Sequence, residues 1–283
     1  MRTTTTLPDH RTVLWALRLA NRAPSAHNTQ PWHWLVGDYS VHLMADRSRL
    51  VPGTDPGERD LVAGCGAALH HLRTALAASG WHARADLLPG TDPDHLASVE
   101  MLRREPSEQD IALARAIPRR HTDRGAFAAR PVPDGHVDLL AGHAAGEGAA
   151  LVPVTDPAHR RIVSTAIAAA AGWQDDTPCT EPLFVLATPA DDVASRLRAG
   201  AATSAVLLAA TSLGLATCPL SRLLRIGHTR ARLRDEVLAG ATHPHLVLRI
   251  GWPAAEPLTR SPRRPVAETV TYLPGTGPRR DEH

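Results

Sequence analysis

The sequence contains no lysine, because all 31 of its Lys and Arg positions are arginine. A P-loop needs a lysine on the phosphates, and a protein kinase needs the lysine of its third strand. Pyridoxal phosphate enzymes and Ser–Lys hydrolases also depend on one. These activities are therefore excluded. Any anion must be held by arginine, backbone N–H groups or hydroxyls, and the planar guanidinium suits bidentate contacts with phosphate.

Other absences narrow the class of protein further. Cys65, Cys179 and Cys218 are isolated, so neither a disulfide framework nor a CxxC metal site is expected. The first residues lack the apolar run of a signal peptide, and no stretch approaches a membrane span. We therefore expect a cytoplasmic protein with no membrane partner. A formal net charge of +2 gives no reason to expect a nucleic-acid partner.

Familiar catalytic and metal motifs are missing too. The chain has no GxSxG, no HExxH and no EF-hand loop. GCGAAL at 64–69 lacks the third glycine of a dinucleotide-binding fingerprint and falls within a predicted helix, so we interpret it as a packing motif. His70 and His71 have no third ligand at a suitable spacing. We interpret them as structural or interfacial residues rather than as a metal site.

What the 283 residues do contain is a pattern of alternating helices and strands, with enough length to bury a core. Ser107 begins one helix, with Asp110 in the capping-box position. Helices are predicted over residues 9–21, 57–79, from 107, from 134, 156–171 and 191–213. Strands are predicted over residues 33–37, 40–46, 81–88, 96–103, 181–188, 215–219 and 245–250.

The two long helices align with each other at an offset of 134. Gly-Ala-Ala at 66–68 then meets Gly-Ala-Ala at 200–202, and the terminal Gly80 meets Gly214. One alternative is that alanine-rich helices align by chance. The matching glycines, each followed by a strand, favour a duplication. We predict an α+β fold of two duplicated halves packed through long central helices.

Three segments of the chain resemble a known family. APSAHNTQPW at 23–32 resembles the flavin loop of the nitroreductase superfamily, and RRHTDRGAF at 119–127 resembles its arginine-rich phosphate segment. GAATSAVLLAATSLGL at 200–215 resembles its long dimer helix. With DRSRL, DPGERDLVAGCGAAL, LRIGWP and SPRRPV, the segments occur in order over residues 10–270. The layout is similar to the Acg-like branch of actinobacterial flavoproteins.

That resemblance implies a nitroreductase-like fold in which a dimer is fused into one chain. Residues 1–104 would form the half that carries the flavin-ring loop, and residues 105–283 the half that carries the phosphate segment. One FMN site would then be built from both halves, and a second site would have decayed. A monomeric pseudo-dimer and a loose homodimer are both compatible with this layout.

The resemblance also assigns the FMN contacts, and it assigns no side chain to catalysis because the hydride chemistry belongs to the flavin. Arg120 and Arg124 would clamp the phosphate, and Thr122 would donate a hydroxyl. The loop at 24–28 would face the ring edge, and the arginine pair at 263–264 would add a contact to the phosphate or the N1 edge. The expected FMN-binding residues are Pro24, Ser25, Ala26, Asn28, Arg120, Thr122, Arg124, Leu220, Ser221, Arg263 and Arg264.

Several of these residues have structural alternatives. The arginines of 119–124 can form a solvated turn, Asn28 can cap its own loop, and 263–264 can belong to a flexible basic tail. Trp32 and Trp34 are interpreted as core and strand packing rather than flavin stacking.

The chain departs from the branch between the helix at 156–171 and the strand at 181–188. Relatives carry a longer segment there, which contributes a lid over the flavin. Only residues 172–181 fill the gap in this sequence. The lid is therefore predicted to be absent or very short, which leaves one flavin face open.

The predicted function is that of an FMN-dependent oxidoreductase. NAD(P)H would give a hydride to the flavin, which would pass it to a small acceptor such as a nitroaromatic or a quinone. One alternative is an FMN storage or sequestration protein with little or no reductase activity, and another is a structural protein with an empty pocket. The expected partners are a small-molecule electron donor and acceptor, and the sequence distinguishes neither NADH from NADPH nor one acceptor from another.

Overall fold

The computed structural model describes residues 8–171, 181–254 and 261–274, and the predicted lid gap therefore lies outside the described residues except for Glu181. Its mixed α and β composition confirms the predicted α+β class. The helices are α1 (His10–Ala20), α2 (Arg59–Ala78), α3 (Glu108–Ala116), α4 (Asp134–Gly146), α5 (Pro157–Ala171), α6 (Val193–Ser212), α7 (Gly227–Arg232) and α8 (Val266–Thr269). The strands are β1 (Trp32–Val36), β2 (Ser40–Ala45), β3 (Trp81–Leu87), β4 (His95–Arg103), β5 (Phe127–Ala128), β6 (Ala150–Pro153), β7 (Leu183–Thr188), β8 (Ala216–Leu220), β9 (His243–Pro253) and β10 (Val270–Tyr272).

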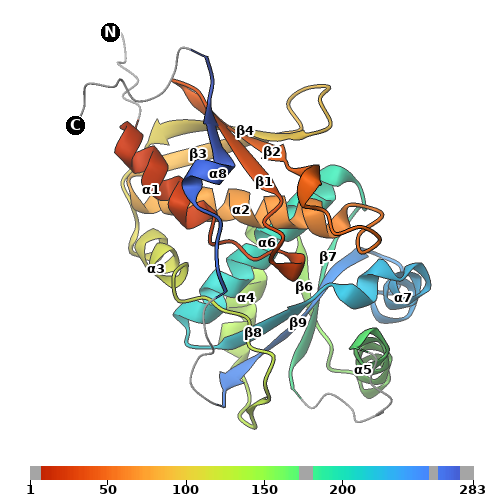
Figure 1. Ribbon diagram of the computed structural model, residues 1–283. Coiled ribbons are helices and arrows are strands. Elements are labelled where there is room, and N and C mark those ends of the chain that lie inside the picture. The colour runs from red at the N-terminus through yellow and green to blue at the C-terminus, as the bar shows by residue number, and fades with distance from the viewer. Residues whose placement is uncertain (1–7, 172–180, 255–260, 275–283) are drawn as a thin grey trace.

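Two sheets lie on either side of a pair of long helices (Figure 1). The first sheet has the strand order β10-β1-β2-β4-β3. The second has the order β5-β9-β7-β6, and β8 also pairs with β9. Buried and half-buried residues alternate along β1, as expected for a strand with one face on the core, whereas every residue of the central strand β7 is buried. Each sheet thus packs one apolar face toward α2 and α6.

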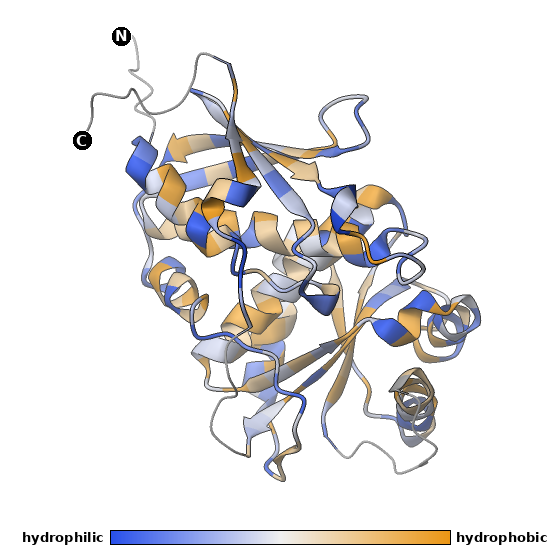
Figure 2. Ribbon diagram, viewed as in Figure 1, coloured by the Kyte–Doolittle hydropathy of each residue, from blue (hydrophilic) through white to orange (hydrophobic). Residues whose placement is uncertain are grey.

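The two central helices touch backbone to backbone where they cross. A Cβ atom on Gly66 of α2 would lie 2.1 Å from the carbonyl oxygen of Leu197, and one on Gly200 of α6 would lie 2.0 Å from the carbonyl oxygen of Ala63. Only glycine permits this approach. The interpretation of GCGAAL as a packing motif is confirmed, and Figure 2 shows hydrophobic residues along both helices in the middle of the molecule.

The C-terminal part of the chain returns to the first sheet. β10 pairs in parallel with β1, with Val270 opposite Trp34. Asn21, at the end of α1, accepts a hydrogen bond from the Trp32 indole at 3.0 Å and donates one to the Thr269 hydroxyl at 2.7 Å. Trp32 and Trp34 are fully buried, which confirms their interpretation as core residues. The division at 104/105 stays a prediction, and it does not anticipate this return of the C-terminal strand.

Two helices begin at the capping residues that the sequence predicts. The Asp9 carboxylate caps α1 by accepting from the N–H of Thr12, and Ser107 and Asp110 form the predicted capping box of α3. Among the described residues, the helices α7 and α8 and the strands β5, β6 and β10 were not predicted. All of them are short, so they depend on tertiary neighbours rather than on their own periodicity.

No helix in the described ranges combines the length and apolar character that a membrane crossing requires.

The helix crossing can be tested with two valine substitutions. Gly66→Val and Gly200→Val each place a side chain against a carbonyl oxygen of the facing helix, so each should cost about 3 kcal/mol or more in free energy of unfolding. Urea denaturation monitored by circular dichroism measures this loss.

Gly142→Ala is the matched control, because a Cβ atom on this glycine of α4 would meet no atom within 4 Å. It should be neutral or stabilising by up to about 1 kcal/mol. Wild-type stability of both valine variants would contradict the close approach.

Candidate functional site

A cavity of about 1140 Å³ lies against the crossing of α2 and α6. Its walls come from the loop after α1, from α2, α5 and α6, from the connector after α3, and from β8 and β9 with the turn that follows β8. The residues that line it are Pro24, Ser25, Ala26, His27, Asp60, Ala63, Gly64, Ala67, Thr122, Arg124, Gly125, Ala126, Ser164, Ile167, Ala168, Ala170, Glu181, Ala199, Gly200, Thr203, Cys218, Pro219, Leu220, Ser221, Arg222, Leu223, Arg225, His245, Leu246 and Arg249.

The structure brings most of the expected FMN-binding residues to this cavity. Those that line it are Pro24, Ser25, Ala26, Thr122, Arg124, Leu220 and Ser221. Those that do not line it are Asn28, Arg120, Arg263 and Arg264. The first group joins residues almost 200 positions apart in sequence, because the loop after α1, the connector after α3 and β8 meet at the helix crossing.

The loop at 24–30 has an unusual backbone. His27, Asn28 and Gln30 all have φ between 51° and 56°, in the left-handed region that non-glycine residues seldom adopt. The Ser25 hydroxyl helps to hold this shape by accepting a hydrogen bond from the N–H of Gln30 at 2.9 Å. Strained backbone of this kind persists only where surrounding contacts determine it, and it is concentrated at ligand sites.

Asn28 connects this loop to the C-terminal segment. Its side-chain nitrogen donates to the carbonyl oxygen of Pro262 at 3.0 Å, and its side-chain oxygen accepts from Arg263 Nη1 at 3.0 Å. Both ends of the amide are therefore engaged by the protein. The structure places Asn28 as the residue that positions Arg263, away from the lining of the cavity.

Arg22, Arg120 and Arg263 form a group of guanidinium side chains that we call the arginine cluster. Arg22 Nη2 donates to the carbonyl oxygen of Pro118 at 3.4 Å, and Arg263 Nη2 donates to the backbone carbonyl of Arg22 at 3.4 Å. Arg120 is only 8% exposed. Burial, followed by repulsion from Arg263 and Arg22, lowers the pKa of Arg120 to about 9. None of the three has a carboxylate partner within the described part of the chain.

Four residues in this region keep buried nitrogen atoms without a hydrogen-bond partner. The atoms are Arg22 Nε, Arg120 Nε and Nη1, Arg263 Nε and His71 Nε2. A buried donor without a partner costs about 1–3 kcal/mol, and more when it is charged, so native proteins rarely contain several together. Convergent guanidinium donors that lack both an acceptor and a counter-charge have the composition of a site for a phosphate group.

Arg264 is engaged elsewhere. Its guanidinium lies 3.4 Å from the carboxylate of Asp46 and donates to the carbonyl oxygens of Gln30 and Glu268. Its backbone N–H donates to the Gln30 side chain at 2.8 Å. Of the arginine pair at 263–264, only Arg263 belongs to the arginine cluster, whereas Arg264 ties the C-terminal segment to the first sheet.

Charged residues that the sequence did not single out complete the cavity wall. Arg225 Nε donates to Asp60 at 2.5 Å, and Arg225 Nη1 lies 3.2 Å from His27 Nε2. Arg249 and Glu181 form a second ion pair. Asp60, His27 and Arg249 lie in segments that carry the resemblance, but none was expected at the site, and only the folded structure brings these scattered residues together. Their charges cancel in pairs.

His245 lies in the same wall and is half-buried, with the charges of Arg59 and Asp191 acting on it in opposite directions. Its Nε2 atom is 2.6 Å from the Thr188 hydroxyl, and its Nδ1 atom is 3.2 Å from Arg59 Nη2. Burial, followed by the charge of Arg59, lowers the pKa of His245 to about 4. The imidazole is therefore neutral at pH 7 and cannot act there as a general acid from a charged state.

No protein-family model matches the chain, but proteins of known sequence are similar to it. A Mycobacterium tuberculosis H37Rv protein with the provisional name NAD(P)H nitroreductase Rv3131 is 37% identical over 321 aligned positions, which cover 95% of this chain and 93% of that protein. The Mycobacterium tuberculosis protein acg, with the same provisional activity in its name, is 31% identical over 309 positions, which cover 89% and 93%.

Solved structures give weaker similarity. Nitroreductase A from Vibrio parahaemolyticus has a TM-score of 0.45 at 19% identity and covers 55% of this chain and 73% of its own. A nitroreductase with bound FMN from Bacteroides fragilis has a TM-score of 0.44 at 17% identity and covers 57% and 98%. The assignment of the chain to a family therefore depends on the sequence relatives.

His245 should make the free energy of unfolding decrease as the pH falls below 6.5. Its pKa in the folded protein, about 4, is below the ordinary value of 6.5, so the unfolded chain binds the proton more tightly. The resulting stability is complete above pH 6.5 and is lost as the pH falls toward 4, at up to about 1.4 kcal/mol per pH unit. His245→Gln should reduce the fall in free energy of unfolding between pH 6.5 and 5, as measured by urea titration.

His228→Gln, on the exposed surface of α7, is the control and should leave the slope unchanged. Equal slopes in the wild type and in His245→Gln would refute the neutral imidazole.

Proposed function

Because the chain belongs to the nitroreductase family, as its relatives of 37% and 31% identity show, we propose that it is an FMN-dependent NAD(P)H oxidoreductase. A small molecule such as a nitroaromatic or a quinone would receive the electrons. The observation that carries the proposal is the arginine cluster with its unpartnered buried nitrogens, beside a cavity large enough for a flavin and a second reactant.

The residues present fit the phosphate of FMN. Arg120 and Arg263 offer unpartnered N–H groups in a region with little access to water, and Arg22 adds a third positive charge. A phosphate dianion would satisfy these donors and neutralise the repulsion that lowers the pKa of Arg120. Thr122 connects the two regions, because it follows Arg120 by two residues and lines the cavity.

The cavity fits the remainder of the cofactor. Pro24, Ser25 and Ala26 form one wall with a backbone that the left-handed loop holds in place, and Leu220 and Ser221 lie in another wall. FMN would supply a ring that accepts and donates a hydride. The protein's contribution is position and charge.

Arg124 was expected to clamp the phosphate together with Arg120, but only Arg124 lines the cavity, where it would supply positive charge to the flavin ring. It is exposed and has no carboxylate partner among the residues that the structure describes. Arg222 shares these properties at the turn after β8. The other arginines of the wall, Arg225 and Arg249, are neutralised by Asp60 and Glu181. Two uncompensated positive charges would favour a reduced, anionic ring and would attract an anionic electron donor such as a nicotinamide dinucleotide.

The volume of about 1140 Å³ exceeds the range of about 300–1000 Å³ that is typical of a site for one small ligand. A flavin would therefore leave room for the donor and the acceptor to occupy its ring face in turn. We treat the site as the product of both halves, 1–104 and 105–283, and the chain as a fused pair that needs no second copy to complete it.

Anaerobic reduction tests the proposal directly. Purified protein is loaded with FMN, the excess is removed, and the flavin absorbance is followed after addition of NADPH or NADH. Rapid bleaching and re-oxidation by a quinone or a nitroaromatic are expected. Bound flavin that neither nucleotide reduces would indicate storage of FMN instead, and a protein that takes up no FMN would refute the site.

Arg120→Gln should have opposite effects on affinity and on stability. It removes a donor from the phosphate, so the Kd for FMN should rise by about tenfold to a hundredfold, corresponding to about 1.4–2.7 kcal/mol. The same change removes a buried charge without a counter-ion, so the flavin-free protein should become more stable. Fluorescence titration and thermal unfolding measure the two effects.

Arg119→Gln is the matched control. This neighbouring arginine is exposed and donates to the carbonyl oxygen of Thr211. Its replacement should change the Kd for FMN less than twofold. If Arg119→Gln and Arg120→Gln weakened FMN binding equally, the phosphate would not lie in the arginine cluster.

A further inference from the structure

His71 is a fully buried histidine on α2 whose hydrogen bonds define its tautomer. Its Nδ1 atom lies 3.2 Å from the carbonyl oxygen of Ala67 and 2.7 Å from the hydroxyl of Ser204 on α6. A carbonyl oxygen can only accept, so the proton of the neutral ring is on Nδ1. The Nε2 atom therefore carries a lone pair, and it is one of the buried atoms without a partner.

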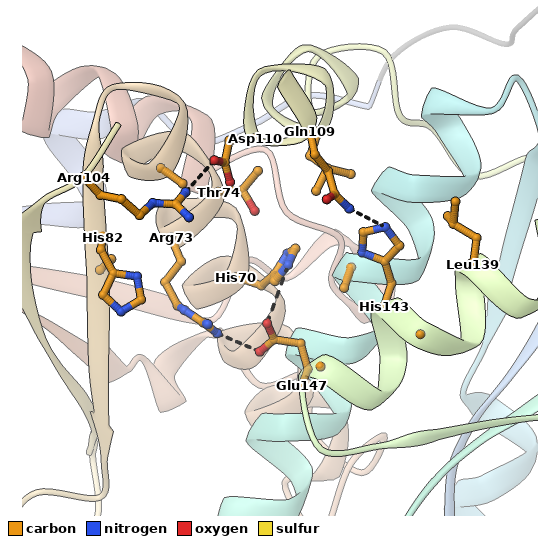
Figure 3. Close-up of a pocket in the computed structure, with 16 residues that line it drawn as sticks. His70, Arg73, Thr74, His82, Arg104, Gln109, Asp110, Leu139, His143 and Glu147 are labelled. Atoms are coloured by element: carbon orange, nitrogen blue, oxygen red, sulfur yellow. Dashed lines mark hydrogen bonds and ion pairs between the residues drawn. The ribbon is translucent and has the colours of Figure 1, made fainter. Parts of the chain in front are cut away.

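The Ser204 hydroxyl also hydrogen-bonds to a second histidine, His70, and so determines its tautomer. Since the serine oxygen accepts from His71, its hydroxyl proton points to His70 Nδ1 at 2.8 Å. The proton of His70 is then on Nε2, which lies 3.9 Å from a carboxylate oxygen of Glu147. His70 and Glu147 line a second cavity of about 520 Å³, where Figure 3 shows His70 and Arg73 pointing toward Glu147. Ser204 and His70 therefore connect the Nδ1 side of His71 to the wall of this second cavity and leave Nε2 as the atom that can accept a proton.

The main charges that act on the neutral His71 ring are positive. They come from Arg120 on the connector after α3 and from Arg263 in the C-terminal segment, and Arg22 acts in turn on both arginines. His70 on α2 would add to them only if it were protonated, and its own pKa is lowered to about 3. Burial first, and then these charges, hold the pKa of His71 well below 6.5, so the imidazole is neutral without a ligand. The positive charges place it next to the arginine cluster.

We propose that His71 is a proton-coupled ligand of the FMN phosphate, so that the phosphate dianion and one proton enter the arginine cluster together. The inference rests on the proposed function, since it concerns the same site. The proton comes from solvent and is held between His71 Nε2 and a phosphate oxygen, and no other bond changes. A dianion would offset the arginine charges and, in direct contact with Nε2, would favour the protonated imidazole.

The expected pH dependence follows from the sign of this change. His71 is neutral before FMN binds and shares a proton afterwards, so the affinity for FMN should rise as the pH falls. Above pH 7.5 the phosphate of free FMN, with a second pKa near 6, is already a dianion and does not contribute. As the pH rises from 7.5 to the pKa of His71 in the FMN complex, the Kd for FMN should increase by up to tenfold for each pH unit.

The test is calorimetric titration of the whole chain with FMN at pH 8, in two buffers whose ionisation enthalpies differ. The wild type should take up close to one proton per FMN. His71→Gln keeps an amide near the position of Nε2 but cannot titrate, so it should bind FMN without proton uptake and with a Kd that is flat with pH. His70→Gln is the matched control, and it should retain the uptake because His70 is not among the residues proposed to hold the phosphate.

Riboflavin, which lacks the phosphate, provides a second measurement on the unaltered protein. It should bind without proton uptake, and this comparison decides the question even if His71→Gln does not fold. FMN binding without proton uptake in the wild type would overturn the role of His71 and leave the proposed function intact. Uptake that persists in His71→Gln or with riboflavin would also overturn it, and a protein that binds no FMN would refute the proposed function together with this inference.

Discussion

The contact between the backbones of α2 and α6 is the constraint from which the rest of the architecture follows. Gly66 faces residue 197, and Gly200 faces residue 63, so the two contacts are related by the offset of 134 that aligns the helices in sequence. An interface in which residue i meets j while the equivalent of j meets the equivalent of i is the signature of two-fold symmetry. This reciprocity supports a duplication, which remains a prediction. A side chain at either glycine would separate the helices and with them the two sheets.

The same crossing explains why the molecule has distinct regions on its two sides. The large cavity lies against Gly64 and Ala67 on α2 and against Ala199 and Thr203 on α6, where small side chains leave space. One turn further along, equivalent positions carry His70 on α2 and Ser204 on α6, and these two unlike residues hydrogen-bond to each other. Any symmetry is therefore broken at its centre. The polar row from Glu147 to His71 runs through one point of an otherwise apolar helix pair.

Local patterns could predict the long helices, the caps of α1 and α3 and the buried tryptophans, and the family resemblance indicated the segments that meet at the cavity. They could not predict how side chains share their hydrogen bonds. Asn28 was expected at the flavin ring, yet its amide is fully used by Pro262 and Arg263. Arg264 was paired with Arg263 by adjacency, although successive side chains of an extended segment point in opposite directions. Arg22 and His71 stand in no motif. Their places at and beside the arginine cluster depend on residues about 50 to 240 positions away, which no local pattern can predict.

The absence of lysine has its clearest consequence in that cluster. A buried lysine among like charges would shed its proton, since its pKa falls readily when it is desolvated. Arginine remains charged, and even the depressed pKa of Arg120, about 9, keeps the guanidinium protonated at pH 7. The repulsion therefore cannot be relieved within the three arginines. Carbonyl oxygens of Pro118, Arg22 and Pro262 hold Arg22 and Arg263 in place, whereas Arg120 keeps unpartnered donors. The neighbour able to adjust its charge at neutral pH is an imidazole, so a site built from arginine alone makes His71 the group on which the proton balance depends.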